Sequence, residues 1–292
     1  MDSSFTNSLE SIESARRPDV DWHRLSTAER IRWIELEGYV VLPDLLPPDR
    51  VETLRTELDE MPTTAVDYSE HQRGVRDLQY SDCRNALGVV ALPAVTDFLG
   101  KLFGDELICT SIAFARSEPG HPGIAIHADA QPYGSKIFGV TASSPCLVRV
   151  LYYLDDLTPK RSPFKVIPRS HLSLHADGIP YERYLAHEDE EMVTCPAGSA
   201  VVINQKVFHG NYPNYDDQPR RLLAIAYRPA WAGPIAEVEE YDESRLSGVP
   251  EDARRYFKSL NTRHINFDVP NRPDDMGRGA AGIAPSRWGN GA

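Results

Sequence analysis

The chain has 292 residues, of which 41% are hydrophobic, and its formal net charge at pH 7 is −12. This length fits one large domain or two small ones, and the apolar content is sufficient for a sizeable core. The acidic balance argues against nucleic acid or an anionic membrane surface as a general partner. No apolar run reaches the length that we expect of a transmembrane helix. These features predict a globular protein that binds neither nucleic acid nor membrane.

Cysteine usage and the first residues predict where the protein resides. The four cysteines are far apart and form no Cys-x-x-Cys pair, so we expect reduced, buried thiols. The first residues lack the basic stretch followed by an apolar one that marks a secretory signal. Both observations predict a cytoplasmic protein. The sequence does not indicate its oligomeric state.

The front of the chain contains helical patterns. Residues 1–22 are polar, and we expect a flexible segment there. The Ser-Thr pair at residues 26–27 is placed to cap a helix over residues 28–36, which Gly38 ends. Residues 39–42 then have the composition of a short buried strand.

Two more helices are predicted before the first long strand. One begins at Pro48, because proline is favoured at the first helical position. Its apolar residues follow at spacings of three and four, as one face of a helix requires: Val51, Leu54, Leu58 and Met61. Residues 67–82 are polar and irregular, which favours a surface loop. Residues 92–103 have the pattern of another amphipathic helix, closed by Gly104.

The middle of the chain is rich in short strand patterns that turn residues separate. The predicted strands cover residues 107–115, 124–130, 146–154, 165–168, 191–195, 199–203 and 220–227. One helical piece follows at residues 251–260, and the low apolar content of residues 278–292 predicts a flexible tail. The sequence therefore predicts a single, mainly β domain over residues 23–277, with helices appended to a barrel or sandwich.

The most informative predicted strand, at residues 124–130, contains His127 and Asp129. Residues two apart on a strand project from the same face, so an imidazole and a carboxylate can reach a single point. His209 follows the predicted strand at residues 199–203 and supplies a second imidazole. Two histidines and one carboxylate on adjacent strands form the facial triad of non-haem Fe(II) oxygenases. By itself, the His-x-Asp pair fits polar residues at a strand end equally well.

Arg220 adds to the specificity of this pattern. It lies near the start of a predicted strand, eleven positions beyond His209. A guanidinium there can make a two-pronged, charge-assisted contact with a carboxylate. The far carboxylate of 2-oxoglutarate needs such a contact while its keto-acid end chelates iron. The combination of all four residues is therefore far more specific than any one of them.

On these residues the sequence resembles the phytanoyl-CoA dioxygenase family of Fe(II)- and 2-oxoglutarate-dependent oxygenases. The resemblance covers roughly residues 30–230. The motifs that carry it are Gly38-Tyr39-Val40-Val41-Leu42, His127-x-Asp129, Ile167-Pro168-Arg169-Ser170-His171, and His209 with Pro219-Arg220. The chain departs from the family in two loops, with Arg161-Ser162 where Asn-Gly is usual and Arg169 where Gly is usual. The resemblance does not predict the conformation of these loops.

The resemblance implies a fold, two cofactors and a reaction. The fold is a double-stranded β-helix, a cupin-like jelly-roll barrel that binds small ligands at its mouth. Fe(II) would be held by His127, Asp129 and His209, and 2-oxoglutarate by Arg220 with help from Asn211. Dioxygen would oxidise the substrate and release succinate and carbon dioxide. Related halogenases have a small residue at the position of Asp129, so we expect hydroxylation or a related oxidation such as desaturation.

Three other histidines are not assigned to the metal. His171 and His175 are four positions apart, but the strand-to-turn context and the resemblance favour a structural hydrogen bond for His171. His121 precedes a Pro-Gly turn and is predicted to lie at the surface.

The substrate is predicted from basic and polar residues near the expected mouth. The candidates that could contact it are Arg73, Arg76, Tyr80, Gln131, Lys136 and Arg149. Arg149 interrupts an apolar strand, so it either faces solvent or points into a pocket with a carboxylate partner. This distribution favours a small polar or anionic substrate, such as a carboxylate or phosphonate. Chance placement of surface charges is the alternative.

Two further classes of protein fit part of the pattern. A cupin-like metalloenzyme that does not use 2-oxoglutarate would leave Arg220 with a structural role. A non-catalytic barrel that binds a small ligand would retain the triad without using it. Succinate release coupled to oxygen uptake separates both from an oxygenase.

Overall fold

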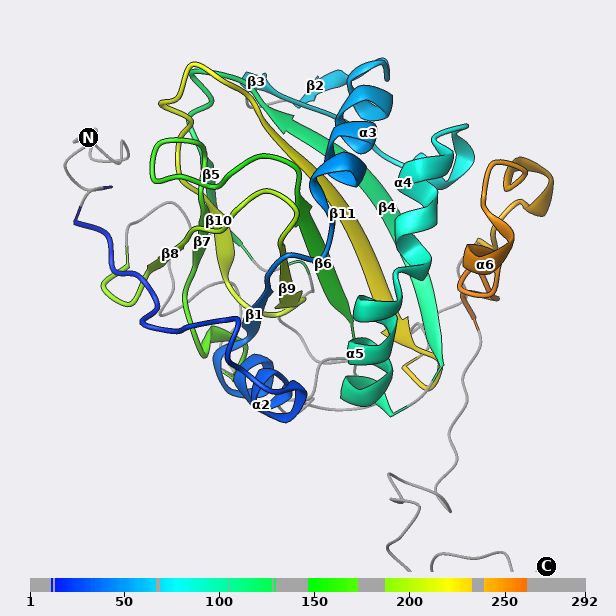
Figure 1. The fold of residues 1–292 in the computed structure, drawn as a ribbon, viewed down its shortest axis with the longest axis horizontal. Coiled ribbons are helices and arrows are strands. Elements are labelled where there is room, and N and C mark those ends of the chain that lie inside the picture. The colour runs from blue at the N-terminus through cyan, green and yellow to red at the C-terminus, as the bar shows by residue number, and fades with distance from the viewer. Residues whose placement is uncertain are drawn as a thin grey trace, which may run out of the picture.

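The computed structural model describes residue 12 and residues 14–66, 69–104, 106–127, 129, 147–172, 187–232 and 239–261. This part of the chain forms two antiparallel β-sheets, with helices across the outer face of the larger one (Figure 1). The large sheet has seven strands in the order β1-β9-β6-β11-β4-β3-β2, and the small sheet has four in the order β5-β10-β7-β8. The prediction of a mainly β protein with appended helices is confirmed.

Each strand predicted from the sequence has a counterpart in these sheets. The large sheet consists of β1 (Tyr39–Leu42), β2 (Thr64–Val66), β3 (Ser69–Val75), β4 (Leu107–Ser117), β6 (Val148–Tyr153), β9 (Ala200–Asn204) and β11 (Arg220–Pro229). The small sheet consists of β5 (Ile124–His127), β7 (Phe164–Val166), β8 (Glu191–Val193) and β10 (His209–Asn211). The helices are α2 (Thr27–Glu37), α3 (Pro48–Asp59), α4 (Arg84–Gly88), α5 (Pro93–Phe103) and α6 (Glu251–Arg254), with short 3-10 turns η1 (Leu78–Tyr80), η2 (Val89–Ala91), η3 (Ser170–Leu172) and η4 (Glu243–Arg245).

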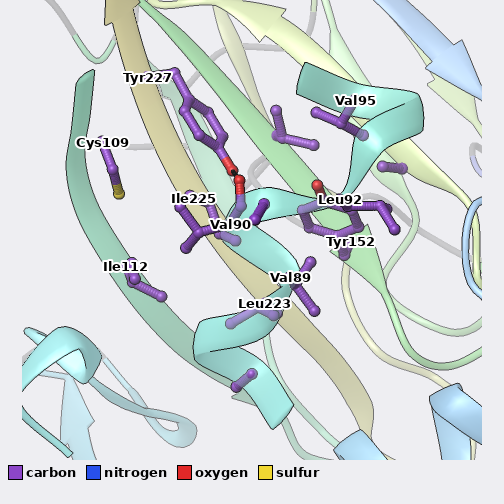
Figure 2. Close-up of a cluster of buried hydrophobic side chains, with 14 of the residues drawn as sticks. Val89, Val90, Leu92, Val95, Cys109, Ile112, Tyr152, Leu223, Ile225 and Tyr227 are labelled. Carbon is purple, nitrogen blue, oxygen red and sulfur yellow. Dashed lines mark hydrogen bonds between the residues drawn. The ribbon is translucent and has the colours of Figure 1, made fainter. Parts of the chain in front are cut away.

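Side chains of the large sheet alternate between two hydrophobic cores. On β6, Tyr152 belongs to the outer core under the helices, whereas Leu151 and Tyr153 belong to the inner core shared with the small sheet. Figure 2 shows part of the outer core, where the Tyr227 hydroxyl donates a hydrogen bond of 2.9 Å to the carbonyl of Val90. Because the inner core contains residues of β7 and β8 as well as of the large sheet, it fixes the two sheets relative to one another.

Local signals fix α2 and its turn into β1. The Ser26 hydroxyl accepts from the Glu29 amide at 3.3 Å, and the Glu29 carboxylate accepts from the Ser26 amide at 2.8 Å, which is a reciprocal helix cap. Gly38 ends the helix with a φ of 86°. A Cβ at Gly38 would lie 2.6 Å from Nδ1 of His171, so glycine is required at this close approach. The predicted helix at residues 28–36 is confirmed, as are those beginning at Pro48 and closed by Gly104.

Two predictions about the peripheral elements are wrong. The polar residues 69–75 form strand β3 rather than a loop, and β3 pairs with β4 through Gln72 opposite Ser117 and Gly74 opposite Ala115. A strand this close to the sheet edge faces solvent and does not need apolar residues, so the sequence lacks a strand pattern. The predicted helix at residues 251–260 is also shorter, since α6 ends at Arg254.

The apolar segment Arg84–Phe103, which comprises α4, η2 and α5, has 20 residues and could cross a membrane by length and composition alone. The expectation that no apolar run is long enough is therefore wrong. In the structure, 61% of the most apolar window of this segment is buried, and Figure 2 shows its middle packed over strands of the large sheet. It is an element of the outer core.

The cysteines that the structure describes agree with the expected reduced state. Cys83, Cys109 and Cys195 are buried free thiols, and Cys146 lies outside the described residues. The cytoplasmic location stays a prediction.

Residues 14–22, which belong to the segment predicted to be flexible, lie against the folded domain. The Met192 amide donates to the carbonyl of Arg16 at 2.8 Å. The ring centroid of Trp22 lies 5.3 Å from that of Trp33 and 6.1 Å from that of Tyr39. The domain boundaries at residues 23 and 277 stay predictions, and the predicted tail at residues 278–292 lies outside the described part of the chain.

Both departures from the family pattern adopt a backbone conformation that favours glycine. Ser162 has a φ of 42° and Arg169 a φ of 66°. The Ser162 hydroxyl donates to the carbonyl of Tyr212 at 3.0 Å. The Arg169 guanidinium makes a two-pronged contact with Glu37, from Nε to Oε2 at 3.0 Å and from Nη2 to Oε1 at 2.9 Å. These side chains therefore hold the loops in the conformation that glycine would adopt.

We expect Arg169→Gly to be more stable than Arg169→Ala. Both variants lose the ion pair with Glu37, but only alanine keeps a Cβ in the left-handed region, at a cost of about 1 kcal/mol. Urea denaturation of the two variants measures this difference directly. If the alanine variant has the same or a larger free energy of unfolding, the backbone at Arg169 is not strained.

Candidate active site

His127, Asp129 and His209 converge where β5 pairs with β10 in the small sheet. Strands β5 and β10 lie side by side in the small sheet (Figure 1), and His127 at the end of β5 is directly opposite His209 at the start of β10. Nε2 of His127 lies 3.6 Å from Oδ1 of Asp129, and Nε2 of His209 lies 3.7 Å from Oδ2 of the same carboxylate. The three residues each offer a donor atom within 4.8 Å of the others.

Asp129 reaches this point by a route that differs from the prediction. Strand β5 ends at His127, so Asp129 is not the next strand residue on the same face. The Asp129 amide instead donates to the carbonyl of Gln205 at 2.8 Å, which ties the turn after β5 to the turn after β9. The three donors thus come together although the predicted strand at residues 124–130 is too long.

Backbone carbonyls fix both imidazoles. Nδ1 of His127 lies 3.0 Å from the carbonyl of Ala125, and Nδ1 of His209 lies 3.0 Å from the carbonyl of Val207. A carbonyl only accepts, so each Nδ1 carries the proton and each Nε2 presents a lone pair toward Asp129. Phe164 stacks on His209 with ring centroids 5.8 Å apart. Both rings are therefore held in the tautomer that a metal ligand requires.

The charge states of these groups also suit a divalent metal. Burial, together with the charge of His127, lowers the pKa of His209 to about 4. Burial alone would raise the pKa of Asp129, but the close approach of His127 and the charges of His209 and Arg149 hold it well below its usual value. At neutral pH the site presents a neutral imidazole of His209 and a carboxylate. Two imidazole nitrogens and one carboxylate oxygen are the donors of non-haem Fe(II) sites.

Arg220 opens strand β11 and is completely buried. Its Nη2 donates to the hydroxyl of Ser117 at 2.7 Å, and that hydroxyl donates to Oε1 of Gln72 at 2.5 Å. Its guanidinium carbon lies 5.8 Å from the ring centroid of Tyr153. The next residue, Arg221, points to the opposite face of the strand and pairs there with Asp59 at 2.8 Å. Arg220 is therefore the arginine that faces the inside.

Asn211 and Tyr153 lie between the triad and Arg220. Asn211 is at the end of β10, two positions from His209, and its amide donates to the carbonyls of Ser162 and Pro163 at 3.4 Å. The Asn211 side chain also interacts with the buried hydroxyl of Tyr153. Sequence reasoning missed Tyr153, Ser117 and Gln72. Tyr153 could have been found, because it lies four positions from Arg149 on the same face of a predicted strand.

Arg149 points to the inside from β6 and contacts the triad directly. Its Nε lies 2.5 Å from Oδ2 of Asp129, and its side chain is 33% exposed. Of the two orientations that the sequence left open, the inward one with a carboxylate partner is therefore correct. That partner belongs to the chain itself.

The other proposed substrate contacts are scattered. Gln131 and Lys136 lie outside the described residues. Arg76 is exposed, and Arg245 stacks over the ring of Tyr80 at 4.1 Å. Arg73 donates to the carbonyl of Thr63 at 2.7 Å, so its charge is directed to the β2–β3 hairpin rather than to the triad.

Two histidines outside the triad, His171 and His121, are buried in the fold. Nε2 of His171 lies 2.9 Å from the carbonyl of Glu35, which confirms its predicted role as a structural hydrogen-bonder. His121 is buried, so its predicted surface position is wrong. Burial, with the nearby charge of Arg220, lowers the pKa of His121 to about 3. His175 lies outside the described residues.

Comparison with known proteins agrees with this architecture. Two solved structures share the fold: HygX from Streptomyces hygroscopicus with nickel and 2-oxoglutarate bound, and the non-heme alpha ketoglutarate dependent epimerase SnoN from nogalamycin biosynthesis. HygX is 18% identical, with a TM-score of 0.57, over 73% of this chain and 93% of its own. SnoN is 18% identical, with a TM-score of 0.58, over 70% of this chain and 83% of its own. The chain therefore shares the fold of these two proteins.

The family follows from the sequence match. The family model for phytanoyl-CoA dioxygenase (PhyH) matches residues 34–222. The chain belongs to the phytanoyl-CoA dioxygenase family, and it is an enzyme whose cofactors are Fe(II) and 2-oxoglutarate. It is also 26% identical to the methylphosphonate hydroxylase of Gimesia maris, over 262 residues that cover 84% of this chain and 96% of that protein. Family membership favours an oxygenase over the two alternatives that the sequence left open.

Proposed function

We propose that this enzyme hydroxylates a C–H bond of a small anionic metabolite at an iron held by His127, Asp129 and His209. The observation that carries this proposal is the donor arrangement. Three metal-binding side chains offer donor atoms within 4.8 Å of one another, and both histidines have Nδ1 committed to a backbone carbonyl. We further propose that the two sheets form the double-stranded β-helix of this enzyme class, with the triad at its open end.

The proposed reaction places one atom of dioxygen in the hydroxylated substrate and the other in succinate. Substrate, 2-oxoglutarate and dioxygen give hydroxylated substrate, succinate and carbon dioxide. Fe(II), when bound, supplies the centre at which dioxygen and the keto acid react. Among the described residues the chain offers three ligands at this point, which would leave the remaining coordination positions to 2-oxoglutarate and oxygen. The Asp129 carboxylate occupies the third ligand position, which supports hydroxylation rather than halogenation.

Arg220 is proposed to bind the far carboxylate of 2-oxoglutarate. It is a buried cation on the inner face, and its Nη2 is held by the Ser117 hydroxyl. Asn211 and Tyr153 lie between the triad and Arg220, and we propose that their polar groups contact the cosubstrate there. A charged group in such a sheltered place binds a carboxylate strongly because little water competes for it.

The substrate is proposed to be a small organic anion, with organophosphonates as the leading class. The likeness to a methylphosphonate hydroxylase over most of both chains supports this choice. The Arg149 guanidinium beside the triad also supports it. Roles for Arg76, Tyr80, Gln131 and Lys136 in substrate binding remain part of the proposal.

Succinate formation tests the proposed reaction. With Fe(II) and 2-oxoglutarate, we expect oxygen uptake and succinate release to rise together when methylphosphonate or a related small anion is added. An oxygen electrode and chromatography of succinate measure both quantities. Turnover of neutral or cationic compounds alone would contradict the anionic substrate. Iron-loaded enzyme that forms no succinate with any compound would contradict the oxygenase reaction itself.

A further inference from the structure

Arg149 is a charged residue in the middle of the large sheet, on the face that points to the inner core. Its strand neighbours Val148 and Val150 are completely buried in the outer core. Leu151, two positions on, belongs to the inner core. Strand alternation therefore puts the Arg149 side chain on the inner side, where a partly buried charge costs more than a charge in water. A charge in this position requires a partner of opposite charge.

The Arg149 guanidinium is tied to the triad through only one of its nitrogens. Nε lies 2.5 Å from Oδ2 of Asp129, and this is the one ion pair of Arg149 among the described residues. A guanidinium has five N–H donors, and four of them are on the two terminal nitrogens. The side chain is also 33% exposed, so water reaches it. The contact with Asp129 therefore fixes the guanidinium and leaves its forked end for another partner.

The inner face beside Arg149 carries small residues. Ala226 of β11 is directly opposite Arg149, and Ser111 of β4 is opposite Ala226. The next pair on this face, Ala224 and Ala113, is only partly buried, whereas residues that alternate with it on the outer face are fully buried. Ala226 itself is buried, so solvent reaches this part of the inner face at Ser111, Ala113 and Ala224. A small ligand can lie there against the forked end of the guanidinium.

We infer that the terminal nitrogens of Arg149 bind the anionic head of the substrate and thereby direct oxidation to the carbon bonded to that head. This inference rests on the proposed function. Phosphonate oxygens match the planar fork of a guanidinium. The positive charge also offsets the repulsion that a phosphonate would otherwise meet from Asp129.

The regiochemistry follows from the anchor on Asp129. Nε of Arg149 contacts a carboxylate oxygen of Asp129. An anion bound to the terminal nitrogens of the same guanidinium is therefore separated from that carboxylate only by the width of the guanidinium group. Reaction requires the reacting atoms to approach to roughly 3–3.5 Å. The first carbon of the substrate is the one that this placement brings to the triad. For a more distant carbon of the substrate to reach the triad, the substrate would have to fold back on itself.

A homologous series of phosphonates tests the inference. Methyl-, ethyl- and propylphosphonate are incubated with iron-loaded enzyme, and ³¹P and ¹³C NMR locate the hydroxyl group. We expect it on the carbon bonded to phosphorus in every product. Anaerobic calorimetric titration of ethylphosphonate into Co(II)-loaded protein measures binding without turnover. There we expect Arg149→Gln to weaken binding at least about tenfold, and Arg149→Lys, which keeps the charge without the fork, to weaken it less.

The matched control is Arg116→Gln, because Arg116 is an arginine of the same sheet, on β4, that pairs with Glu118 at 2.6 Å on the outer face. We expect it to bind ethylphosphonate as the wild type does. Co(II) stoichiometry is measured for each variant, so that loss of the metal is not mistaken for loss of the anion site. Hydroxylation at a distal carbon, or wild-type affinity in Arg149→Gln, would overturn the inference while leaving the oxygenase reaction in place. Wild-type enzyme that forms no succinate with any phosphonate would overturn the inference and the choice of organophosphonates as substrate, whereas the oxygenase reaction fails only if no compound at all gives succinate.

Discussion

Alanine at His127, Asp129 or His209 is expected to abolish substrate-dependent succinate formation. Each residue supplies one of the three donors, and even partners that only orient a metal ligand typically contribute about 10- to 100-fold to affinity or activity. Loss of a donor should therefore reduce turnover below detection. The rest of the fold does not depend on these side chains, so the far-UV circular dichroism spectrum should be unchanged. Steady-state succinate formation at saturating Fe(II) measures the effect.

His23→Ala is the control for the two histidine variants. His23 is an exposed histidine far from the triad in the sequence, with its Nδ1 3.5 Å from Asp44. We expect wild-type activity from this variant. A triad variant that keeps more than a few per cent of wild-type activity would show that its side chain is not a metal ligand.

Arg220→Ala is expected to raise the 2-oxoglutarate requirement strongly. Arg220 is a fully buried cation on the inner face, and losing one partner of a sheltered charge pair costs about 2–5 kcal/mol. At about 1.4 kcal/mol per tenfold, this corresponds to an increase in the apparent KM for 2-oxoglutarate of roughly 30-fold or more. Initial rates of succinate formation across a range of 2-oxoglutarate concentrations give the value.

Arg221→Ala is the matched control, one residue along the same strand. Arg221 contacts Asp59 at 2.8 Å and Asp155 at 3.1 Å on the outer face, and it joins α3 to the sheet. We expect it to leave the KM for 2-oxoglutarate near the wild-type value and to lower the free energy of unfolding by about 1–3 kcal/mol. The reverse result, a large effect of Arg221→Ala on KM and none of Arg220→Ala, would place the cosubstrate on the other face of β11.

Much of the scaffold follows from local signals in the sequence. The Ser26 cap, Pro48 at a helix start, and Gly38 and Gly104 at helix ends all act within a few residues, so they predict α2, α3 and α5 closely. Strand β3 was missed because a peripheral polar strand gains its stability from pairing with β4, and that partner is distant in the sequence. Burial of His121 likewise depends on which segments pack over it.

The candidate site shows the same division. The residue types and spacing of His127, Asp129 and His209 predict the convergence, but not the path of the chain through it. Asp129 is placed by the carbonyl of Gln205, a contact between turns that no pattern within one segment reveals. The partner of Arg149 was likewise open, because strand alternation gives a direction and not a contact. Positive φ values at Ser162 and Arg169 explain why glycine suits those positions, although the chain uses other residues there.

Metal stoichiometry tests the assignment of His127, Asp129 and His209 most directly. The wild-type protein and an Asp129→Ala, His209→Ala double variant are titrated with Fe(II) under anaerobic conditions, and bound metal is quantified after gel filtration. We predict about one Fe(II) per wild-type chain and no retained iron in the double variant, since a single imidazole does not hold the ion. Stoichiometric Fe(II) binding by the double variant would contradict the assignment.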